Sequence, residues 1–244
     1  MRYVVISDIH ANLAAFKAVL RDAELRGGFD EIWCMGDVVG YGPEPHECIE
    51  LLKQYRHICV AGNHDWAAVR KIDISDFHPD AAQVCLWTMQ HITEDDVWYL
   101  QNLPIELRRG DFTMVHGSPR WPIWEYVLSV DEACASFGRM DTCFCFVGHS
   151  HVPLFFGQDD TGDCWMQRSP SEITLPAGHQ RLIINPGGVG QPRDGDPRSS
   201  YVIYDDDAHQ ISYYRVDYDI VITQRKMKEY NFPSSLILRL NYGY

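Results

Sequence analysis

The sequence has no long apolar segment and no leader-like start. No apolar run approaches the roughly 18 to 20 residues that a membrane-spanning helix requires. We therefore expect that this is not an integral membrane protein. The chain passes from Met1 and Arg2 directly into YVVIS, without a basic segment, a longer apolar segment and a cleavage site. We therefore also expect that the protein is not secreted.

Basic residues are few compared with acidic ones. The chain has 21 Lys and Arg against 34 Asp and Glu, which gives a formal net charge of −13. No basic block is long enough to follow a phosphate backbone, so we expect no long nucleic acid as partner. An anionic substrate would have to be attracted by something other than side-chain charge. Bound cations are the obvious candidates.

The eight cysteines form no CxxC pair, the spacing found in zinc knuckles and redox motifs. Several of them lie inside apolar runs, as buried thiols do. This distribution favours reduced, buried cysteines in a cytoplasmic protein over disulfides. At 45% hydrophobic and 23% charged residues, the composition is that of an ordinary soluble globular protein.

The first part of the chain alternates between two hydrophobic periods. Short apolar runs with the pattern of strands lie at 3–7, 31–37 and 57–63. The segments between them, 12–28 and 43–55, have helical spacing. This βαβαβ order predicts a parallel sheet with right-handed crossovers. Two further helices are predicted at 78–92 and 93–103, the second with Thr93 as its N-cap.

Strands are predicted to predominate in the second half, at 111–117, 143–149, 181–187, 199–205 and 209–217. The DDDA segment between the last two has hairpin chemistry. We find no repeat and no linker, so we expect one domain over residues 1–244, with a tail of strand or helix at 218–244. The Gly-rich and Pro-rich segment 185–197 is a candidate functional loop.

Residues able to bind a metal follow five of these apolar runs. They are Asp8 and His10, then Asp37, then Asn63 and His64, then His116, and finally His149 and His151. Residues two apart on a strand point to the same face, so His149 and His151 would converge if the extended conformation continues past Gly148. Each residue alone is compatible with a turn or a cap. Together, at the edge where α/β proteins build their sites, they indicate one shared metal site.

The motifs DIH, GD, GNHD, the isolated His of VHGSP, and GHSH resemble, in this order, the five motifs of the calcineurin-like metallophosphoesterases. Segments such as GDVVGYGPEP and INPGGVGQPRDGDPRSSY are similar to the small prokaryotic phosphoesterase branch. The resemblance extends from Tyr3 to about Asp217. It implies an α/β sandwich of two mixed β-sheets flanked by helices. It also implies a dimetal phosphatase or phosphodiesterase that acts on a small phosphorylated substrate.

The resemblance further implies a role for each matched residue. One metal ion would be held by Asp8, His10 and His151, and the second by Asn63, His116 and His149, with Asp37 bridging the two. A metal-bridging hydroxide would attack the phosphorus, and His64 would act as the general acid for the leaving group. Imidazole, carboxylate and amide ligands without thiolate suit divalent manganese, iron, zinc, nickel or cobalt.

The chain departs from part of the superfamily after the second predicted strand. The protein serine/threonine phosphatases and the symmetrical dinucleoside tetraphosphatases have an Asp that orients the catalytic His and an Arg that grips phosphate. This chain has Gly40 and Tyr41 at those positions. Asp65 could orient His64 or could cap a helix. Arg193 or Arg198 could bind the substrate phosphate in place of the missing arginine, or the loop could be a plain strand connection with a salt-bridged arginine.

Two other interpretations stay open. Within enzymes, the chain could hydrolyse dinucleoside polyphosphates or cyclic nucleotides. Trp121, Trp124 and Tyr126 would then stack on a base, or would only pack the surface of their loop. Outside enzymes, it could be a protein-binding scaffold. A retromer subunit has the same fold but serves as an interaction module, because it has lost its site residues. The presence of all seven candidate ligands and His64 favours the enzyme.

Overall fold

The computed structural model describes residues 1–168, 172–174 and 180–244. The described strands are β1 (Arg2–Ile6), β2 (Glu31–Cys34), β3 (His57–Cys59), β4 (Glu106–Arg109), β5 (Phe112–Val115), β6 (Phe144–Phe146), β7 (Pro153–Gln158), β8 (Cys164–Arg168), β9 (Glu172–Thr174), β10 (Arg181–Pro186), β11 (Ser199–Asp205) and β12 (Gln210–Val216). The described helices are α1 (Leu13–Leu25), α2 (Pro45–Lys53), α3 (Asn63–Ala68), α4 (Pro79–His91), α5 (Glu94–Gln101), α6 (Val130–Phe137), α7 (Ile220–Glu229) and α8 (Ser234–Arg239).

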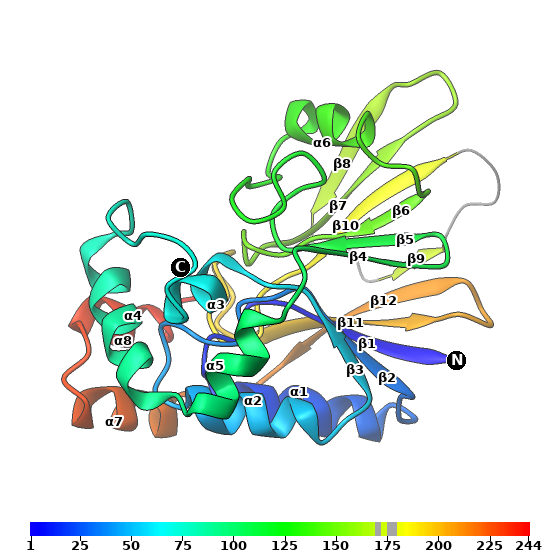
Figure 1. Cartoon of the computed structure of the whole chain (residues 1–244). Coiled ribbons are helices and arrows are strands. Elements are labelled where there is room, and N and C mark those ends of the chain that lie inside the picture. Colours follow the sequence, from blue (N-terminus) through cyan, green and yellow to red (C-terminus); the bar gives the residue numbers. More distant parts are fainter. Residues whose placement is uncertain (169–171, 175–179) are drawn as a thin grey trace.

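The strands form two mixed sheets that pack face to face (Figure 1). The first sheet has the order β3-β2-β1-β11-β12-β9, and the second has the order β4-β5-β6-β10-β7-β8. Strands β1, β2 and β3 run parallel, so the predicted βαβαβ unit is confirmed, while β11 pairs antiparallel with β1. The expected sandwich of two mixed sheets flanked by helices is therefore confirmed.

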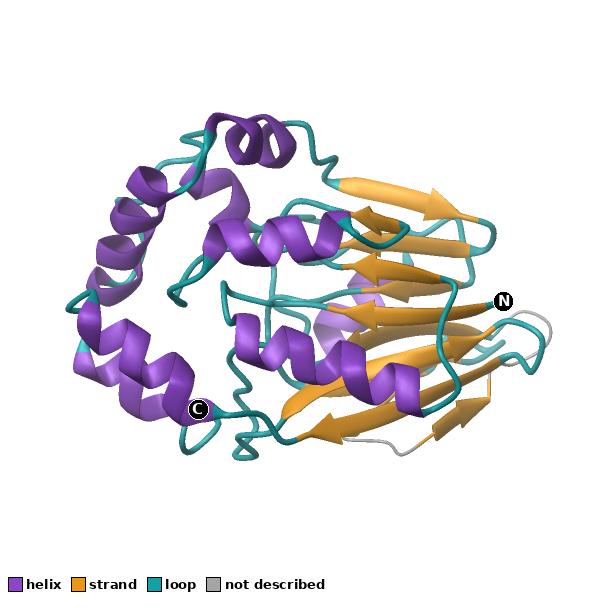
Figure 2. Ribbon diagram, turned by 90° about the horizontal axis from the view of Figure 1, so that it is seen from below, coloured by secondary structure: helices purple, strands orange, loops and turns teal. Residues whose placement is uncertain are grey.

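Three apolar layers hold the sandwich together. Trp33, Phe112 and Phe146 are among the side chains that fill the space between the sheets, and the rings of Phe112 and Phe146 stack at 5.4 Å. Helices α1 and α2 cover the outer face of the first sheet (Figures 1 and 2), where Phe16 and Ile49 are fully buried. Helix α6 covers the outer face of the second sheet. Burying both faces of each sheet leaves the strand ends as the place for polar side chains.

The remaining helices gather beyond the carboxyl ends of β1, β2 and β3 (Figure 2). The expected N-cap of α5 is confirmed, because the Thr93 side chain accepts a hydrogen bond from the main-chain N–H of Asp96. The tail after residue 217 consists of α7 and α8, whose apolar faces pack with α4 around Val84 and Met227. Within the described ranges, every helix is too short or too polar to cross a membrane.

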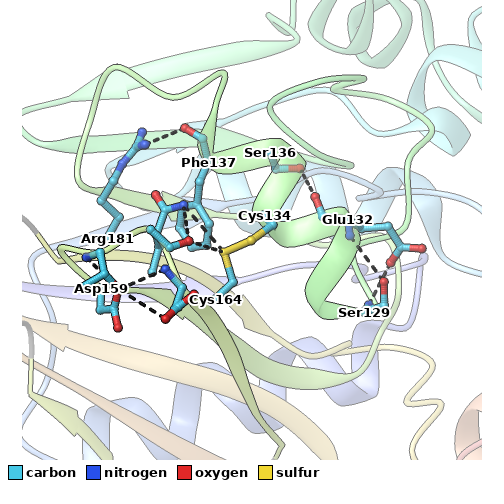
Figure 3. The surroundings of a disulfide bond; sticks show 12 residues. Ser129, Glu132, Cys134, Ser136, Phe137, Asp159, Cys164 and Arg181 are labelled. Carbon is cyan, nitrogen blue, oxygen red and sulfur yellow. Dashed lines mark hydrogen bonds between the residues drawn. A yellow bond between two sulfur atoms is a disulfide. The ribbon is translucent and has the colours of Figure 1, made fainter.

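Cys134 on α6 and Cys164 on β8 form a disulfide (Figure 3). Our expectation of reduced cysteines is wrong for this pair, and the other six are free, with Cys143 half-buried and five buried. The two cysteines lie 30 residues apart in the sequence. The packing of α6 on the sheet brings their Cα atoms to within 5.9 Å of each other. The disulfide therefore weakens the support that the cysteines give to a cytoplasmic location, while the six free cysteines still agree with it.

Candidate metal centre

The candidate ligands stand where the chain leaves the strands, and several have left-handed backbone conformations. Positive φ angles occur at Asp8 (55°), His10 (49°), Asp37 (52°), His149 (62°) and His151 (59°). Such conformations cost about 1 to 3 kcal/mol each in residues other than glycine, and persist only where the surrounding structure imposes them. The extended continuation expected past Gly148 is therefore wrong. The two histidines after it turn to different halves of the site.

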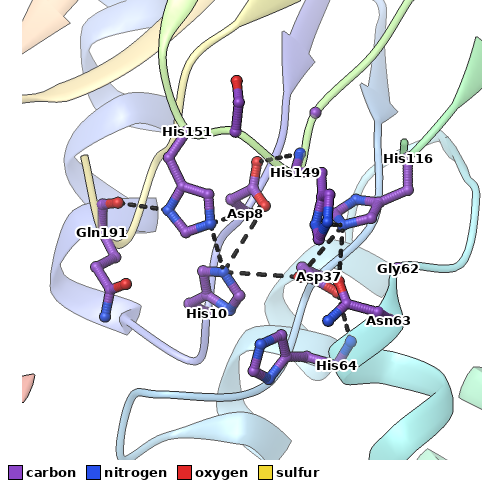
Figure 4. Close-up of polar contacts among 12 residues, drawn as sticks. Asp8, His10, Asp37, Gly62, Asn63, His64, His116, His149, His151 and Gln191 are labelled. Carbon is purple, nitrogen blue, oxygen red and sulfur yellow. Dashed lines mark hydrogen bonds and ion pairs between the residues drawn. The ribbon is translucent and has the colours of Figure 1, made fainter. Parts of the chain in front are cut away.

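The first half of the site consists of Asp8, His10 and His151 (Figure 4). The Nε2 atoms of the two imidazoles lie 3.1 Å apart. Oδ1 of Asp8 lies 3.2 Å from Nε2 of His151 and 3.7 Å from Nε2 of His10. All three side chains are buried, and Oδ1 of Asp8 has no hydrogen-bond partner among the described residues.

The second half of the site consists of Asn63, His116 and His149, with Asp37 between the halves (Figure 4). Nε2 of His116 lies 3.1 Å from Nδ1 of His149 and 3.2 Å from Oδ1 of Asn63. Oδ2 of Asp37 lies 3.3 Å from Nε2 of His116 and 3.7 Å from Nε2 of His10. The structure thus brings all seven predicted ligands into one buried cluster.

The hydrogen bonds of three imidazoles fix which nitrogen carries the proton. Nδ1 of His10 donates to the main-chain carbonyl of Val39. In the same way, Nδ1 of His116 donates to the carbonyl of Met35, and Nδ1 of His151 donates to that of Gln191. A carbonyl oxygen can only accept, so each Nδ1 carries a hydrogen, and each ring presents its Nε2 lone pair to the cluster when it is neutral.

In the neutral rings of His10 and His151, two Nε2 lone pairs therefore face each other without a hydrogen atom between them. At 3.1 Å, the facing Nε2 atoms of His10 and His151 would repel each other unless a cation lies between them. The imidazole, carboxylate and amide groups fit divalent cations as ligands.

Burial governs the electrostatics of the cluster. It lowers the pKa of His10, His149 and His151 well below the usual range, so these rings stay neutral and able to bind metal. For His116 burial also acts to lower the pKa, but the charge of Asp37 outweighs it and raises the pKa to about 10. Burial raises the pKa of the Asp8 carboxyl to about 7. The buried carboxylates thus call for positive charge beside them, which divalent ions supply.

Asp65 braces the backbone of the site and does not contact the ring of His64. Its carboxylate accepts hydrogen bonds from the main-chain N–H groups of Asp37 at 2.8 Å, of Gly62 at 3.0 Å and of Val39 at 3.1 Å. It caps α3 through Gly62. Of the two roles considered for Asp65, the structure shows the cap.

His64 is placed beside the cluster by its own backbone and by aromatic packing. Its main-chain N–H donates to Oδ1 of Asp37 at 2.8 Å. Its ring lies 4.5 Å from the ring of Tyr41 and 5.0 Å from that of Phe77. Nδ1 of His64 is buried without a hydrogen-bond partner in the described ranges, and burial lowers the pKa of this imidazole to about 4.

A cavity of about 730 Å³ opens over the cluster. His64, His149 and His151 line its floor, and its other lining residues include Phe77 and Trp124.

Two of the three aromatic residues singled out after position 120 face this cavity. Trp124 and Tyr126 line it, and the ring of Tyr126 stacks on His149 at 4.0 Å. Trp121 lies outside the lining, where Arg120 covers its ring. Tyr126 thus packs on a candidate ligand, and Trp124 offers a half-exposed ring to a bound molecule.

Arg193 also lines the cavity, with its guanidinium 5.5 Å from the centre of the Tyr41 ring. It donates to the side-chain oxygen of Gln191 at 3.0 Å. Among the described residues it forms no ion pair with a carboxylate, whereas Arg198 in the same loop pairs with Asp196 at 2.6 Å. Within the described residues, the salt bridge considered for an arginine of this loop is therefore found at Arg198 and not at Arg193.

The sequence comparison shows the family to which the chain belongs. Residues 1–209 match the calcineurin-like phosphoesterase superfamily domain. The chain belongs to that superfamily, whose members are dimetal-dependent, and it is a metal-dependent phosphoric ester hydrolase. This confirms the family and the reaction class expected from the five motifs.

Three relatives show how far the similarity reaches. The crystal structure of a metallophosphoesterase from Sphaerobacter thermophilus is 45% identical, with a TM-score of 0.89 and 100% of both chains covered. The uncharacterized protein MJ0912 of Methanocaldococcus jannaschii is 37% identical over 98% of this chain and 97% of its own length. A symmetrical bis(5'-nucleosyl)-tetraphosphatase of Pseudomonas entomophila is 28% identical over 57% of this chain. The match spans about half of that enzyme, 52% of its length.

Proposed function

We propose that this chain is a phosphatase or phosphodiesterase that hydrolyses a small phosphorylated substrate at a site for two divalent ions. The observation that carries this proposal is the convergence of imidazole nitrogens and carboxylate oxygens beside an open cavity. A scaffold without activity has no use for such a buried set of acceptors. The polarity of the floor suits a phosphoryl group held by cations.

In this proposal the seven clustered residues divide between two ions. One ion would be held by Asp8, His10 and His151, and the other by Asn63, His116 and His149, with Asp37 shared. When bound, such ions polarise phosphoryl oxygens and lower the pKa of water enough for it to attack at neutral pH. The donor set contains no thiolate, which favours manganese, iron, zinc, nickel or cobalt.

The chain's own groups hold this arrangement in place. Main-chain carbonyls of Met35, Val39 and Gln191 fix three imidazoles in the tautomer that binds metal. His64 faces the cavity from the side of Asp37, and we assign it the proton for the leaving oxygen. Because its pKa is low in the free protein, His64 gains that proton when an anionic phosphate lies beside it.

The extent of the catalytic unit is part of the proposal. β11 pairs with β1, so strands from both ends of the sequence share the first sheet. Helices α7 and α8 then pack on α4. We therefore propose a single domain over residues 1–244. We also keep the cytoplasm as the proposed location and small phosphorylated molecules as the proposed partners.

A second candidate is a hydrolase of dinucleoside polyphosphates or cyclic nucleotides. The cavity of about 730 Å³ favours it, because the space exceeds that needed by a single phosphate. Trp124 and Phe77 offer rings on which a base could stack.

The experiment that tests the proposed function is a substrate panel with added metals. Purified protein is assayed with phosphomonoesters, phosphodiesters and dinucleoside polyphosphates, each with manganese, nickel or zinc. We expect metal-dependent hydrolysis of at least one class, and its loss when the metal is chelated. Hydrolysis that is unaffected by chelation, or no hydrolysis of any class with any metal, would contradict the proposal.

A further inference from the structure

Two arginines from distant parts of the chain meet at one side-chain amide. Arg193, in the loop 185–197, donates to Oε1 of Gln191 at 3.0 Å. Arg239, at the end of α8, donates to the same oxygen at 3.2 Å. Both arginines line the cavity over the candidate metal centre. Two guanidinium groups therefore share a single neutral acceptor.

The positive charge of this pair is not balanced by side-chain carboxylates. Neither arginine forms an ion pair with an Asp or Glu in residues 1–168, 172–174 or 180–244. Besides the shared amide, Arg239 donates to a terminal oxygen of Tyr244, the last residue of the chain, at 2.6 Å, so at most one of the two charges has an anionic partner. Burial, with the charge of Arg193 added, lowers the pKa of Arg239. Two like charges held together in a partly buried wall are costly unless an anion binds between them.

The amide that gathers these arginines also belongs to the metal centre. The main-chain carbonyl of Gln191 accepts from Nδ1 of His151, while its side chain extends away from the imidazole cluster (Figure 4). Nε2 of Gln191 is buried and has no hydrogen-bond partner in the described residues. An anion at the arginine pair would thus lie next to a phosphoryl group at the metal centre.

The rest of the cavity indicates what the anion is attached to. Phe77 and Trp124 lie edge to face, with ring centres 6.1 Å apart, and both line the same cavity as the arginines. Asp76 and Asp80 also line it, and Asp80 accepts a hydrogen bond from Ser235 on α8. Aromatic side chains in the wall suit a planar ring.

We propose that Arg239 and Arg193 bind a second phosphate group of the substrate. The substrate class is then a phosphoanhydride that carries a planar aromatic group, such as a nucleoside diphosphate or polyphosphate. This inference rests on the proposed function. Hydrolysis adds one water across the P–O–P bridge, breaks one P–O bond, leaves a phosphate group on each product, and releases a proton near neutral pH.

The kinetic test compares two substrates and three variants. Arg239→Met removes the charge and nearly keeps the length of the side chain. Arg239→Lys keeps a positive charge but lacks the paired N–H donors of the guanidinium group. The control is Arg225→Met, because Arg225 lies on α7 with its side chain 72% exposed. We expect Arg239→Met to lower kcat/KM for adenosine diphosphate by about tenfold to a hundredfold, the loss of one charge-assisted hydrogen bond.

With 4-nitrophenyl phosphate, which has no second phosphate to contact the guanidinium group, the loss of kcat/KM in Arg239→Met should be smaller by a factor of at least about five. Arg239→Lys should fall between the wild type and Arg239→Met, and Arg225→Met should match the wild type on both substrates. Equal losses on both substrates, or no loss on either, would overturn the inference.

A binding measurement keeps this inference separate from the proposed function. The methylene-bridged analogue of adenosine diphosphate is titrated calorimetrically into metal-loaded protein, with inorganic phosphate as the comparison. We expect Arg239→Met to weaken binding of the analogue at least about tenfold more than binding of phosphate. That result without any hydrolysis supports the arginine site and contradicts the proposed function. Hydrolysis of monoesters together with analogue binding unchanged by Arg239→Met contradicts only the inference.

Discussion

A Cβ atom added at Gly40 would lie 2.6 Å from Nδ1 of His64. Gly40 has φ of +92°, and the imidazole occupies the space that any other side chain there would fill. In the protein serine/threonine phosphatases and the symmetrical dinucleoside tetraphosphatases, from which this chain departs here, an Asp at this place orients the catalytic His. Here the ring has no such partner and rests on Gly40 and on the Tyr41 ring. The position of the ring is therefore determined by packing.

Gly40→Ala should therefore displace His64 and lower kcat. We expect a loss of at least about tenfold, up to the ~10²- to 10⁴-fold that general acid catalysis contributes. Gly162→Ala is the matched control, because Gly162 also has φ of +92° but has no atom within 4 Å of its added Cβ. Both variants share the backbone strain, so only the clash distinguishes them. Equal kcat values in the two variants would show that the ring does not depend on Gly40.

His64→Ala should lose more rate as the leaving group becomes more basic. With an alkoxide leaving group we expect a loss of ~10²- to 10⁴-fold, because that oxygen needs a proton as it departs. A nitrophenolate hardly needs one, so its loss should be much smaller. The measurement is kcat over a series of esters, plotted against the pKa of the leaving group.

Metal content serves as the control for this series. The seven candidate ligands are untouched in His64→Ala, so the metal stoichiometry should stay as in the wild type. A uniform loss across all esters, or loss of an ion, would mean that His64 binds metal or merely positions the phosphate.

Arg193→Ala should weaken the use of substrate without removing metal. We expect a higher KM or a lower kcat/KM, by a factor equivalent to ~1.5 to 3 kcal/mol for a charge-assisted hydrogen bond. Arg198→Ala is the control from the same loop, because Arg198 already pairs with Asp196. If Arg193→Ala behaves as the wild type on every substrate, the guanidinium does not meet a phosphate.

The disulfide predicts a count of free thiols and a loss of stability on its removal. Alkylation of the denatured, unreduced chain should modify six cysteines, and reduction should raise the count to eight. Replacing Cys134 and Cys164 with Ser should lower the free energy of unfolding by about 3 to 4 kcal/mol, the chain-entropy value for a loop of this size. Denaturant titration measures it. Eight thiols before reduction would contradict the bond.

The parallel strands and their shared edge could be predicted from sequence, because local hydrophobic periods determine them. Strands β1, β2 and β3 are short apolar runs, and a candidate metal ligand follows shortly after each of them in the sequence. The candidate residues followed from those ends, and their division into seven ligands and His64 followed from the resemblance to the calcineurin-like metallophosphoesterases. The conformation did not, because an extended chain is the default after a strand. Only the packed turns hold His149 and His151 at positive φ.

What the sequence could not supply are contacts made by tertiary packing alone. Arg239 lies 46 residues after Arg193 in a short helix without any motif, and only the docking of α8 brings the two together. The pair Cys134 and Cys164 is of the same kind, because its partners lie on different elements 30 residues apart. Neither relationship leaves a periodic or spacing signal in the chain.

The metal content of Asp37→Asn tests the central claim most directly. Asp37 lies between the two halves of the cluster. Its Oδ2 atom is 3.7 Å from Nε2 of His10 and 3.3 Å from Nε2 of His116. Elemental analysis of the wild-type protein should give two divalent ions per chain. His151→Ala should lose mainly one of them, and Asp37→Asn should weaken both sites together. Two ions retained at unchanged affinity in Asp37→Asn would contradict a shared dimetal centre.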